Sequence, residues 1–164
     1  MGVRSAISME EYLHTSYPGT DREFRDGEVV ERSMPDYFHG ECQTNLFIFF
    51  GAMKRKHSLY PSTETRMRMP NNRVLIPDVS VFSDRPPRLP IKPPMVAIEV
   101  LSPDDRMRAV EQKLKEYKDW GILHVWLVDP DSRRMYIYED QLTEVAALPL
   151  PEFDTAVTPG DIFG

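Results

Sequence analysis

The run from Met95 to Leu101 constrains the fold more than any other stretch of the chain. Six of its seven residues are apolar, which predicts a β-strand buried on both faces of a sheet. Glu99 lies inside this run. Burying a carboxylate alone is so unfavourable that Glu99 must be paired, protonated or bound to a cation. We therefore expect a polar site around this strand.

A second apolar run, Val74–Phe82, carries Asp78 in the same way. Pro77 interrupts this run and removes one ladder donor, which indicates a strand edge or a bulge. If the two predicted strands pair side by side, Asp78 and Glu99 come within reach of one cation. A hard ion such as Mg²⁺ or Mn²⁺ takes carboxylate oxygens, carbonyl oxygens and waters as ligands, and the carbonyl of Val100 is a further candidate.

The segment after the central strand predicts a helix that carries Lys113. Ser102 or Asp104 is expected to cap its N-terminus, and Gly121 to follow its last residue. From such a helix, Lys113 would orient a metal-bound water or help to deprotonate it. Two strand carboxylates and a lysine suit the hydrolysis of a phosphodiester, whose substrate needs charge neutralisation as well as a positioned nucleophile.

Each of these residues also has a structural interpretation without catalysis. Glu99 would then pair with Arg66 or Arg68 across the sheet, and Asp78 would only end a strand after a proline. Lys113 would be an exposed helix lysine, which is the commonest environment of that residue. The three residues together favour the site, because two carboxylates in apolar strands followed by a basic helix form an uncommon pattern.

The remaining patterns predict helices and strands in mixed order. Ser8 is expected to cap a short helix, with Glu11 in a capping box, and Asp26-Gly27 to join two strands as a hairpin. The other expected elements are a helix at 39–57, strands at 63–69, 124–129 and 134–138, a proline-rich connection at 85–94, and a tail at 142–164 with a short strand, a loop and a terminal turn. The predicted fold class is α/β, or α+β, with a mixed central β-sheet flanked by helices.

The length of 164 residues predicts a single domain. Within it we expect an N-terminal helix and hairpin at 1–36, a core at 37–140 and a C-terminal tail at 141–164. Cys42, the one cysteine, excludes an intrachain disulfide and a multi-cysteine zinc site, and we interpret it as a buried side chain rather than a nucleophile.

The net charge of −6 excludes a protein that is basic all over, although local patches decide whether nucleic acid binds. No apolar run approaches the roughly 20 residues that cross a bilayer, so we expect no membrane partner. The amino terminus turns acidic before an apolar signal core forms, and its sixth residue, Ala6, does not fit the myristoylation pattern. A cytoplasmic protein is therefore predicted.

Several strings of residues resemble a known family. They are Ile76-Pro77-Asp78-Val79-Ser80-Val81, Ile98-Glu99-Val100-Leu101-Ser102-Pro103, Lys113-Leu114 with Tyr117, Gly121-Ile122, and Val125-Trp126-Leu127-Val128-Asp129-Pro130. Glu10-Glu11-Tyr12-Leu13, Asp26-Gly27-Glu28 and His39 match further positions. Together they resemble the Uma-type putative restriction endonuclease family of the PD-(D/E)XK nuclease superfamily.

The resemblance implies a restriction-endonuclease-like fold that binds Mg²⁺ through Asp78 and Glu99, with Mn²⁺ as a substitute. In the superfamily pattern a lysine stands two residues after the glutamate, where this chain has Leu101. The family lysine lies on the next helix instead and matches Lys113. His39 matches a recurrent polar position and is a candidate for contact with the metal shell or a phosphate.

Other positions follow from the same resemblance. Glu28, together with His39, is a second-tier site candidate. Family members usually carry an aspartate four residues before the helix lysine, where this chain has Ala109. Either that aspartate is dispensable or another acidic residue takes its role, the candidates being Asp104, Asp105 and Glu111.

The leading functional hypothesis is a Mg²⁺-dependent endonuclease that hydrolyses phosphodiester bonds in DNA. We expect a homodimer, because cutting both strands of a duplex requires two sites. The alternative is a catalytically inactive nuclease-fold protein that binds nucleic acid or a protein partner, which Leu101 and Ala109 favour. RNA is a further possible substrate, since no groove-reading helix or aromatic stacking platform identifies DNA.

Overall fold

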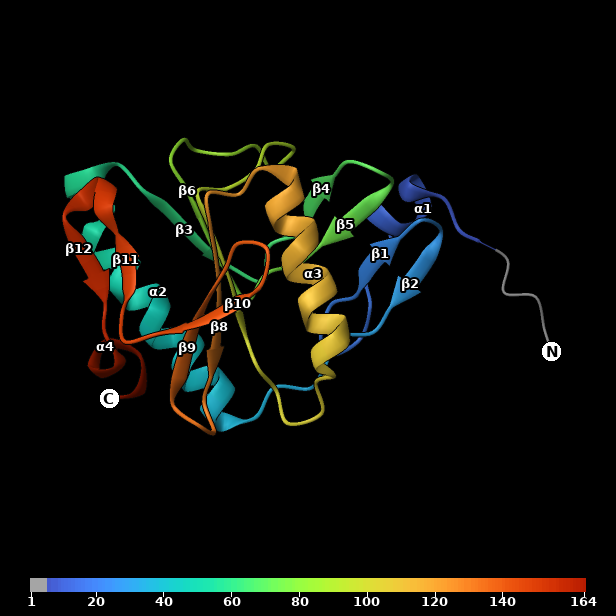
Figure 1. The fold of residues 1–164 in the computed structure, drawn as a ribbon. Helices are drawn as coiled ribbons and strands as arrows, with labels where there is room; N and C mark the ends of the chain where they lie inside the picture. Colours follow the sequence, from blue (N-terminus) through green and yellow to red (C-terminus); the bar gives the residue numbers. More distant parts are fainter. Residues whose placement is uncertain (1–5) are drawn as a thin grey trace.

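The computed structural model describes residues 6–164 and confirms the mixed architecture (Figure 1). Its largest element is a six-stranded sheet in the order β10-β9-β8-β7-β6-β3. These strands are β3 (Tyr60–Thr63), β6 (Val79–Phe82), β7 (Val96–Val100), β8 (His124–Asp129), β9 (Arg134–Tyr138) and β10 (Leu142–Val145). The pair β7–β8 is parallel and the other neighbours are antiparallel, so the sheet is mixed as predicted.

Two long helices cover opposite faces of this sheet (Figure 1). The first, α2 (Tyr37–His57), packs on the face that carries the side chains of Val96, Ile98 and Val100. The second, α3 (Met107–Trp120), packs on the face of Ala97. Successive side chains of a strand alternate between faces, so Glu99 points to the side of α3.

The N-terminal part forms a smaller four-stranded sheet beside the large one, in the order β2-β1-β5-β4. Its strands are β1 (Glu23–Arg25), β2 (Glu28–Val30), β4 (Met67–Met69) and β5 (Arg73–Leu75), and α1 (Met9–Leu13) packs against it. The Asp26-Gly27 hairpin is as predicted, with both residues at positive φ. Ser8 caps α1 by accepting a hydrogen bond from the backbone N–H of Glu11, as predicted.

Two of the predicted strands are wrong, because each is divided between the two sheets. The segment 63–69 separates into β3 and β4 around Glu64, whose φ of 55° breaks the extended conformation. The segment 74–82 separates into β5 and β6 at Pro77, which has no N–H for a strand ladder. Apolar patterning reports burial in both halves, but it does not reveal that the chain crosses between sheets.

The start of α3 and the structure of the tail also differ from expectation. The predicted caps of α3 are wrong: its N-cap is Arg106, without a side-chain cap, rather than Ser102 or Asp104. Asp105 accepts a hydrogen bond from the backbone N–H of Ser102 at 2.7 Å. Gly121 ends the helix at a φ of 104°, as predicted. The tail contains more structure than expected: a hairpin of β11 (Leu148–Leu150) and β12 (Thr155–Val157), the short helix η1 (Pro151–Phe153), and α4 (Pro159–Phe163).

Burial of Cys42 confirms its structural interpretation, and burial raises the pKa of its thiol to about 11, so it carries no thiolate at neutral pH. Over residues 6–164, no helix is both long enough and apolar enough to cross a membrane. The predictions about the amino-terminal signal concern residues that lie largely outside the described part.

Candidate active site

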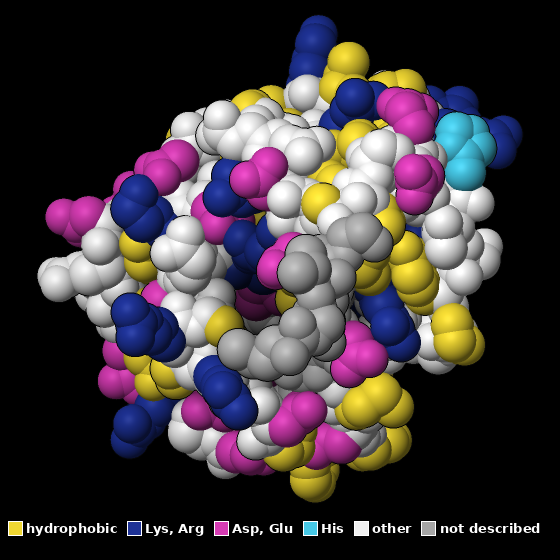
Figure 2. Space-filling model, turned by 90° about the vertical axis from the view of Figure 1, so that its right-hand side faces the viewer, with side chains coloured by type: hydrophobic (Ala, Val, Ile, Leu, Met, Phe, Trp, Pro, Cys, Tyr) yellow, Lys and Arg dark blue, Asp and Glu magenta, His cyan; other side chains and the backbone are white. Residues whose placement is uncertain are grey.

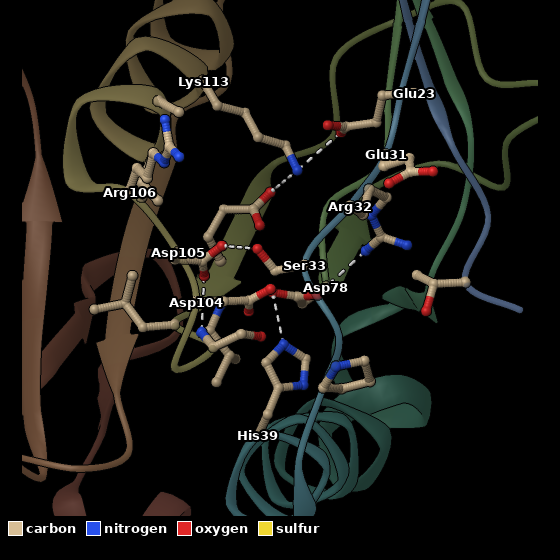
Figure 3. Close-up of a pocket in the computed structure, with 18 of the residues that line it drawn as sticks. Glu23, Glu31, Arg32, Ser33, His39, Asp78, Asp104, Asp105, Arg106 and Lys113 are labelled. Carbon is tan, nitrogen blue, oxygen red and sulfur yellow. Dashed lines mark hydrogen bonds and ion pairs between the residues drawn. The ribbon is translucent and has the colours of Figure 1, made fainter.

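Asp78 and Glu99 lie on neighbouring chain segments of the large sheet, as the sequence predicts. The antiparallel register of β6 and β7 pairs Val79 with Ile98, and one step further it sets Asp78 opposite Glu99. Both carboxylates line a pocket of about 300 Å³ between the large sheet, the N-terminal hairpin and the start of α3 (Figure 3). The predicted constellation is therefore assembled at one surface pocket.

Asp78 is held by three donors and is only 4% exposed. The backbone N–H of Val100 donates to its Oδ2 at 2.7 Å, and the Nε2 atom of His39 lies 3.3 Å from the same oxygen. Arg32 Nη2 donates to Oδ1 at 3.3 Å. Burial alone would raise the pKa of Asp78, but the hydrogen bond and charge of His39 hold it below its usual value. Asp78 is therefore an oriented, ionised carboxylate.

Glu99 has a different environment, although it lies next to Asp78. Lys113 Nζ pairs with Glu99 Oε1 at 2.8 Å, and the hydroxyl of Tyr117 donates to the same oxygen at 2.7 Å. Burial, together with the neighbouring carboxylates Asp78 and Glu23, raises the pKa of Glu99 to about 8 against the opposing effect of Lys113. The two carboxylates thus differ in proton affinity, and a nearby cation would stabilise both in the charged form.

Lys113 is buried between two carboxylates rather than solvated. Its Nζ lies 2.8 Å from Glu99 Oε1 and 2.8 Å from Glu23 Oε2, as Figure 3 shows, and it donates to the carbonyl of Ile76 at 3.0 Å. Burial lowers the pKa of Lys113, but the two carboxylates outweigh it and hold the pKa above its usual value. The lysine is therefore a fixed cation beside Glu99, in a pocket that Leu101 also lines.

Glu23 is a site residue that the sequence analysis missed. It begins β1 and comes from the small sheet, yet its Oε2 atom contacts Lys113 and also accepts the backbone N–H of Ile76 at 2.7 Å. The only signal in the sequence is a charged residue directly before the apolar Phe24 in a three-residue strand. A strand so short offers no alternation from which burial can be inferred.

Arg32 was missed as well. Its side chain is 8% exposed, pairs with Asp78 and also forms an ion pair with Glu64. Burial opposes the charge, but the hydrogen bond and charge of Glu64, and the charge of Asp78, raise the pKa of Arg32 above its usual value. Gln43 completes this side by donating to the backbone carbonyl of Asp78 at 2.8 Å. The guanidinium is thus a permanent cation beside the proposed metal ligand.

Of the other residues proposed from the sequence, some line the pocket and some do not. Glu28 is exposed on β2 and does not line the pocket, while Ala109 does line it. Of the acidic residues offered as substitutes for an aspartate at 109, Asp104 and Asp105 line the pocket and Glu111 does not. Asp105 also accepts a hydrogen bond from the hydroxyl of Ser33 in the N-terminal segment (Figure 3).

The arginines suggested as partners of Glu99 are engaged elsewhere, so that interpretation is wrong. Arg66 forms two hydrogen bonds to Asp21, at 2.7 and 2.8 Å, and Arg68 lies 3.7 Å from Glu10. Both acidic partners belong to the N-terminal part of the chain. The partners of Glu99 are instead Lys113 and Tyr117.

The donor atoms of the pocket fit a hard divalent cation with an incomplete protein shell. Within residues 6–164 there is no preassembled group of three or more His, Cys, Asp or Glu side chains for a metal ion. Mg²⁺ is typically held by one or two carboxylates, with waters and substrate phosphates as its other ligands. Asp78 and Glu99 meet that smaller requirement, and no thiolate in the pocket favours a softer metal.

The face beside the small sheet mixes both signs of charge. Figure 2 shows Lys and Arg side chains interspersed with Asp and Glu side chains there, without a continuous basic surface. Long-range attraction of a polyanion is therefore weak, and binding must rely on contacts within the pocket and its rim.

Comparison with known proteins agrees with these features. The sequence model of the Uma2 family, described as "Putative restriction endonuclease", matches residues 9–163. The chain belongs to the Uma2 family. No curated protein matches it in sequence.

Among solved structures, this Uma2 chain is similar to a putative nuclease of family DUF820 from Anabaena variabilis ATCC 29413. The TM-score is 0.82 at 22% identity, over 96% of this chain and 97% of that one. At this identity the likeness shows the fold, and it confirms the predicted nuclease-like architecture.

Proposed function

We propose that this Uma2 protein is a Mg²⁺-dependent endonuclease that hydrolyses phosphodiester bonds in DNA. One observation carries the proposal: Asp78, Glu99 and Lys113, drawn from two strand segments and a helix, converge at one open pocket. Membership of a restriction endonuclease family supports the same reaction class.

In this proposal Asp78, Glu99 and the carbonyl of Val100 hold the metal ion. When bound, such an ion lowers the pKa of a water and neutralises charge on the scissile phosphate. Asp78 is oriented for ligation because the N–H of Val100 fixes one of its oxygens at 2.7 Å. His39 and Arg32 contact the same carboxylate from the side of α2 and of the N-terminal segment, which restricts its rotation.

Lys113 takes the role that the superfamily pattern gives to a lysine at the position of Leu101. Its Nζ lies 2.8 Å from Glu99, so it stands beside the carboxylate pair and can stabilise a hydroxide or the negative charge of the phosphate in the transition state. Glu23 and the carbonyl of Ile76 hold the ammonium in place. The lysine is therefore positioned before substrate arrives.

Three finer points remain predictions. A homodimer is expected because cutting a duplex requires two sites. DNA is preferred to RNA because of the family description alone. A cytoplasmic location also stays a prediction.

The proposal is tested with purified protein and plasmid DNA in the presence of MgCl₂ or MnCl₂. Asp78→Asn and Glu99→Gln keep the shape of each side chain and should each abolish cleavage, while Asp119→Asn, at an exposed position on α3, should not. EDTA should stop the wild-type reaction. If the wild type cleaves neither DNA nor RNA, and binds DNA with an affinity that EDTA does not change, the inactive binding protein is the correct alternative.

A further inference from the structure

The exposed apolar side chains of this protein are concentrated on one segment. Of the eight large hydrophobic residues exposed within residues 6–164, five lie between positions 34 and 48. They are Met34, Tyr37, Phe38, Phe47 and Ile48, with exposures from 39% to 76%. Single exposed apolar residues are ordinary, but a contiguous group marks a surface that binds another molecule.

Two of these five, Tyr37 and Ile48, belong to a stripe on the outer side of α2, and helical spacing puts Phe38 and Phe47 on opposite flanks of it. Tyr37, Thr44, Ile48 and Gly51 are spaced by seven, four and three residues, so they lie along one line of the helix. The opposite side carries the buried Cys42, Leu46 and Phe50, which pack on the large sheet. The outer stripe therefore presents two large apolar side chains with small residues between and beside them, and the described part of the chain does not cover them.

Two glycines in α2 point to close approach by another backbone. A Cβ atom added to Gly40 or Gly51 would meet nothing within 4 Å, so neither glycine is required by contacts within the chain. Glycine in a helix interior costs about 1 kcal/mol relative to alanine. Both positions flank the centre of the outer stripe, where they would let a second helix approach closely.

The charges at the two ends of α2 are opposite. Asp36 and Glu41 lie at its start, and Lys54, Arg55 and Lys56 lie in its last turn. Within the described chain, none of these five residues forms an ion pair. The middle of the stripe carries no charge. A helix with these ends is complementary to an antiparallel copy of itself.

We propose that the outer stripe of α2 is the interface of a homodimer, in which two α2 helices pack antiparallel about a two-fold axis near Thr44–Ile48. Such an isologous contact brings the Gly40 end of one helix against the Gly51 end of the other, and each acidic start against a basic end. The proposal gives an interface to the homodimer proposed above, and the observations on α2 that carry it do not depend on the nuclease chemistry.

This arrangement leaves both pockets accessible. His39 is buried on the inner side of α2, where it contacts Asp78, and helical spacing puts it nearly opposite the outer stripe. A nucleic acid is a poorer occupant of the stripe, because its uncharged centre offers no cation for phosphates. A second copy satisfies both the apolar centre and the charged ends.

The first test measures association by sedimentation velocity over a range of protein concentrations. The wild type should be a concentration-dependent dimer, and Ile48→Glu and Gly51→Glu should each raise Kd at least tenfold. Ile91→Glu, at an exposed apolar residue in the proline-rich connection, is the matched control and should leave Kd unchanged. Circular dichroism verifies that each variant is folded.

The second test uses the opposite charges and distinguishes a helix pair from a nonspecific apolar contact. Glu41→Lys and Arg55→Glu alone should each raise Kd about tenfold, because each contact occurs twice in the dimer, and the double variant should restore association. A dimer that is insensitive to all these changes overturns the α2 interface but leaves the homodimer standing. A wild type that is monomeric throughout overturns both, and the cleavage assay on the same sample then judges the nuclease proposal separately.

Discussion

The two sides of the pocket are built differently. On the sheet side, Asp78 and Glu99 are fixed by strand register and by a backbone N–H, within the best-buried part of the molecule. On the hairpin side, Glu23 and Arg32 come from short N-terminal segments and reach the pocket through long side chains. The sheet side presents carboxylates to a ligand, whereas the hairpin side contacts those carboxylates and Lys113.

This difference separates two kinds of contribution. Removing a group that binds the metal or the transition state should lower the rate most, since that interaction belongs to the reaction itself. Removing a group that only orients a metal ligand or the lysine should lower the rate less, typically ten- to a hundredfold. The variants below test that order.

Asp78→Asn is expected to have the largest effect. The variant loses one charged ligand of the metal ion, and the ion stabilises the transition state by several kcal/mol. Since each 1.4 kcal/mol corresponds to a tenfold change in rate, the rate of Mg²⁺-dependent cleavage should fall about 10³-fold. The measurement is single-turnover cleavage of a labelled duplex, with calorimetric Mn²⁺ binding as a second readout. Unchanged metal affinity and rate would remove Asp78 from the site.

Lys113→Gln should come next, with a loss of about 10²-fold in single-turnover rate. It should also lower the free energy of unfolding by about 3 kcal/mol, since two buried carboxylates lose their cation. Urea unfolding measures the second effect, and Lys115→Gln, at an exposed lysine on the same helix, is the control for both. A full rate with the stability loss alone would make Lys113 a structural residue.

Glu23→Gln tests the hairpin side directly and should lower the rate about tenfold. Because Glu23 positions Lys113 without reaching the substrate, we expect kcat to fall while KM stays the same. Glu11→Gln, at an exposed carboxylate of α1, is the control. A loss as large as that of Asp78→Asn would contradict the division between the two sides and make Glu23 a ligand.

Asp21→Asn should leave cleavage unchanged and lower the free energy of unfolding by about 1 kcal/mol at pH 7, since the Asp21–Arg66 contact is partly exposed. Although burial acts in the opposite direction, the hydrogen bonds from Arg66 hold the pKa of Asp21 below its usual value. The stabilisation is therefore present above about pH 4 and is lost as the pH falls through the lowered pKa. Urea unfolding of both proteins at pH 7 and pH 3 measures it; a constant difference would contradict the ionic explanation.

The sheet side of the pocket is the part that can be predicted from the sequence. Asp78 and Glu99 are conspicuous because they interrupt apolar runs, and Lys113 lies on a helix with clear periodicity. A charged residue inside an apolar run is visible in the local sequence pattern. The same local pattern also predicts turns and caps such as Asp26-Gly27 and Ser8.

The hairpin side could not be predicted in the same way. Glu23 and Lys113 are 90 positions apart, and nothing near either residue indicates the other. The crossings at Glu64 and Pro77 depend on backbone conformation, whereas the apolar pattern continues on both sides of each crossing. Ser102 and Asp104 were the expected caps of α3, but the helix begins after Arg106 and the N–H of Ser102 is bound by Asp105, which local rules do not decide.

The hydrogen bonds of the Ile76 backbone affect which site residues can be lost during evolution. It is fully buried where the chain leaves one sheet for the other, and its N–H and carbonyl are bonded to Glu23 and Lys113 instead of a neighbouring strand. Leaving these groups unsatisfied would be destabilising, so selection for folding alone preserves both side chains. A descendant that had lost catalysis would still need this glutamate and lysine in order to fold, so their presence alone does not identify an active enzyme.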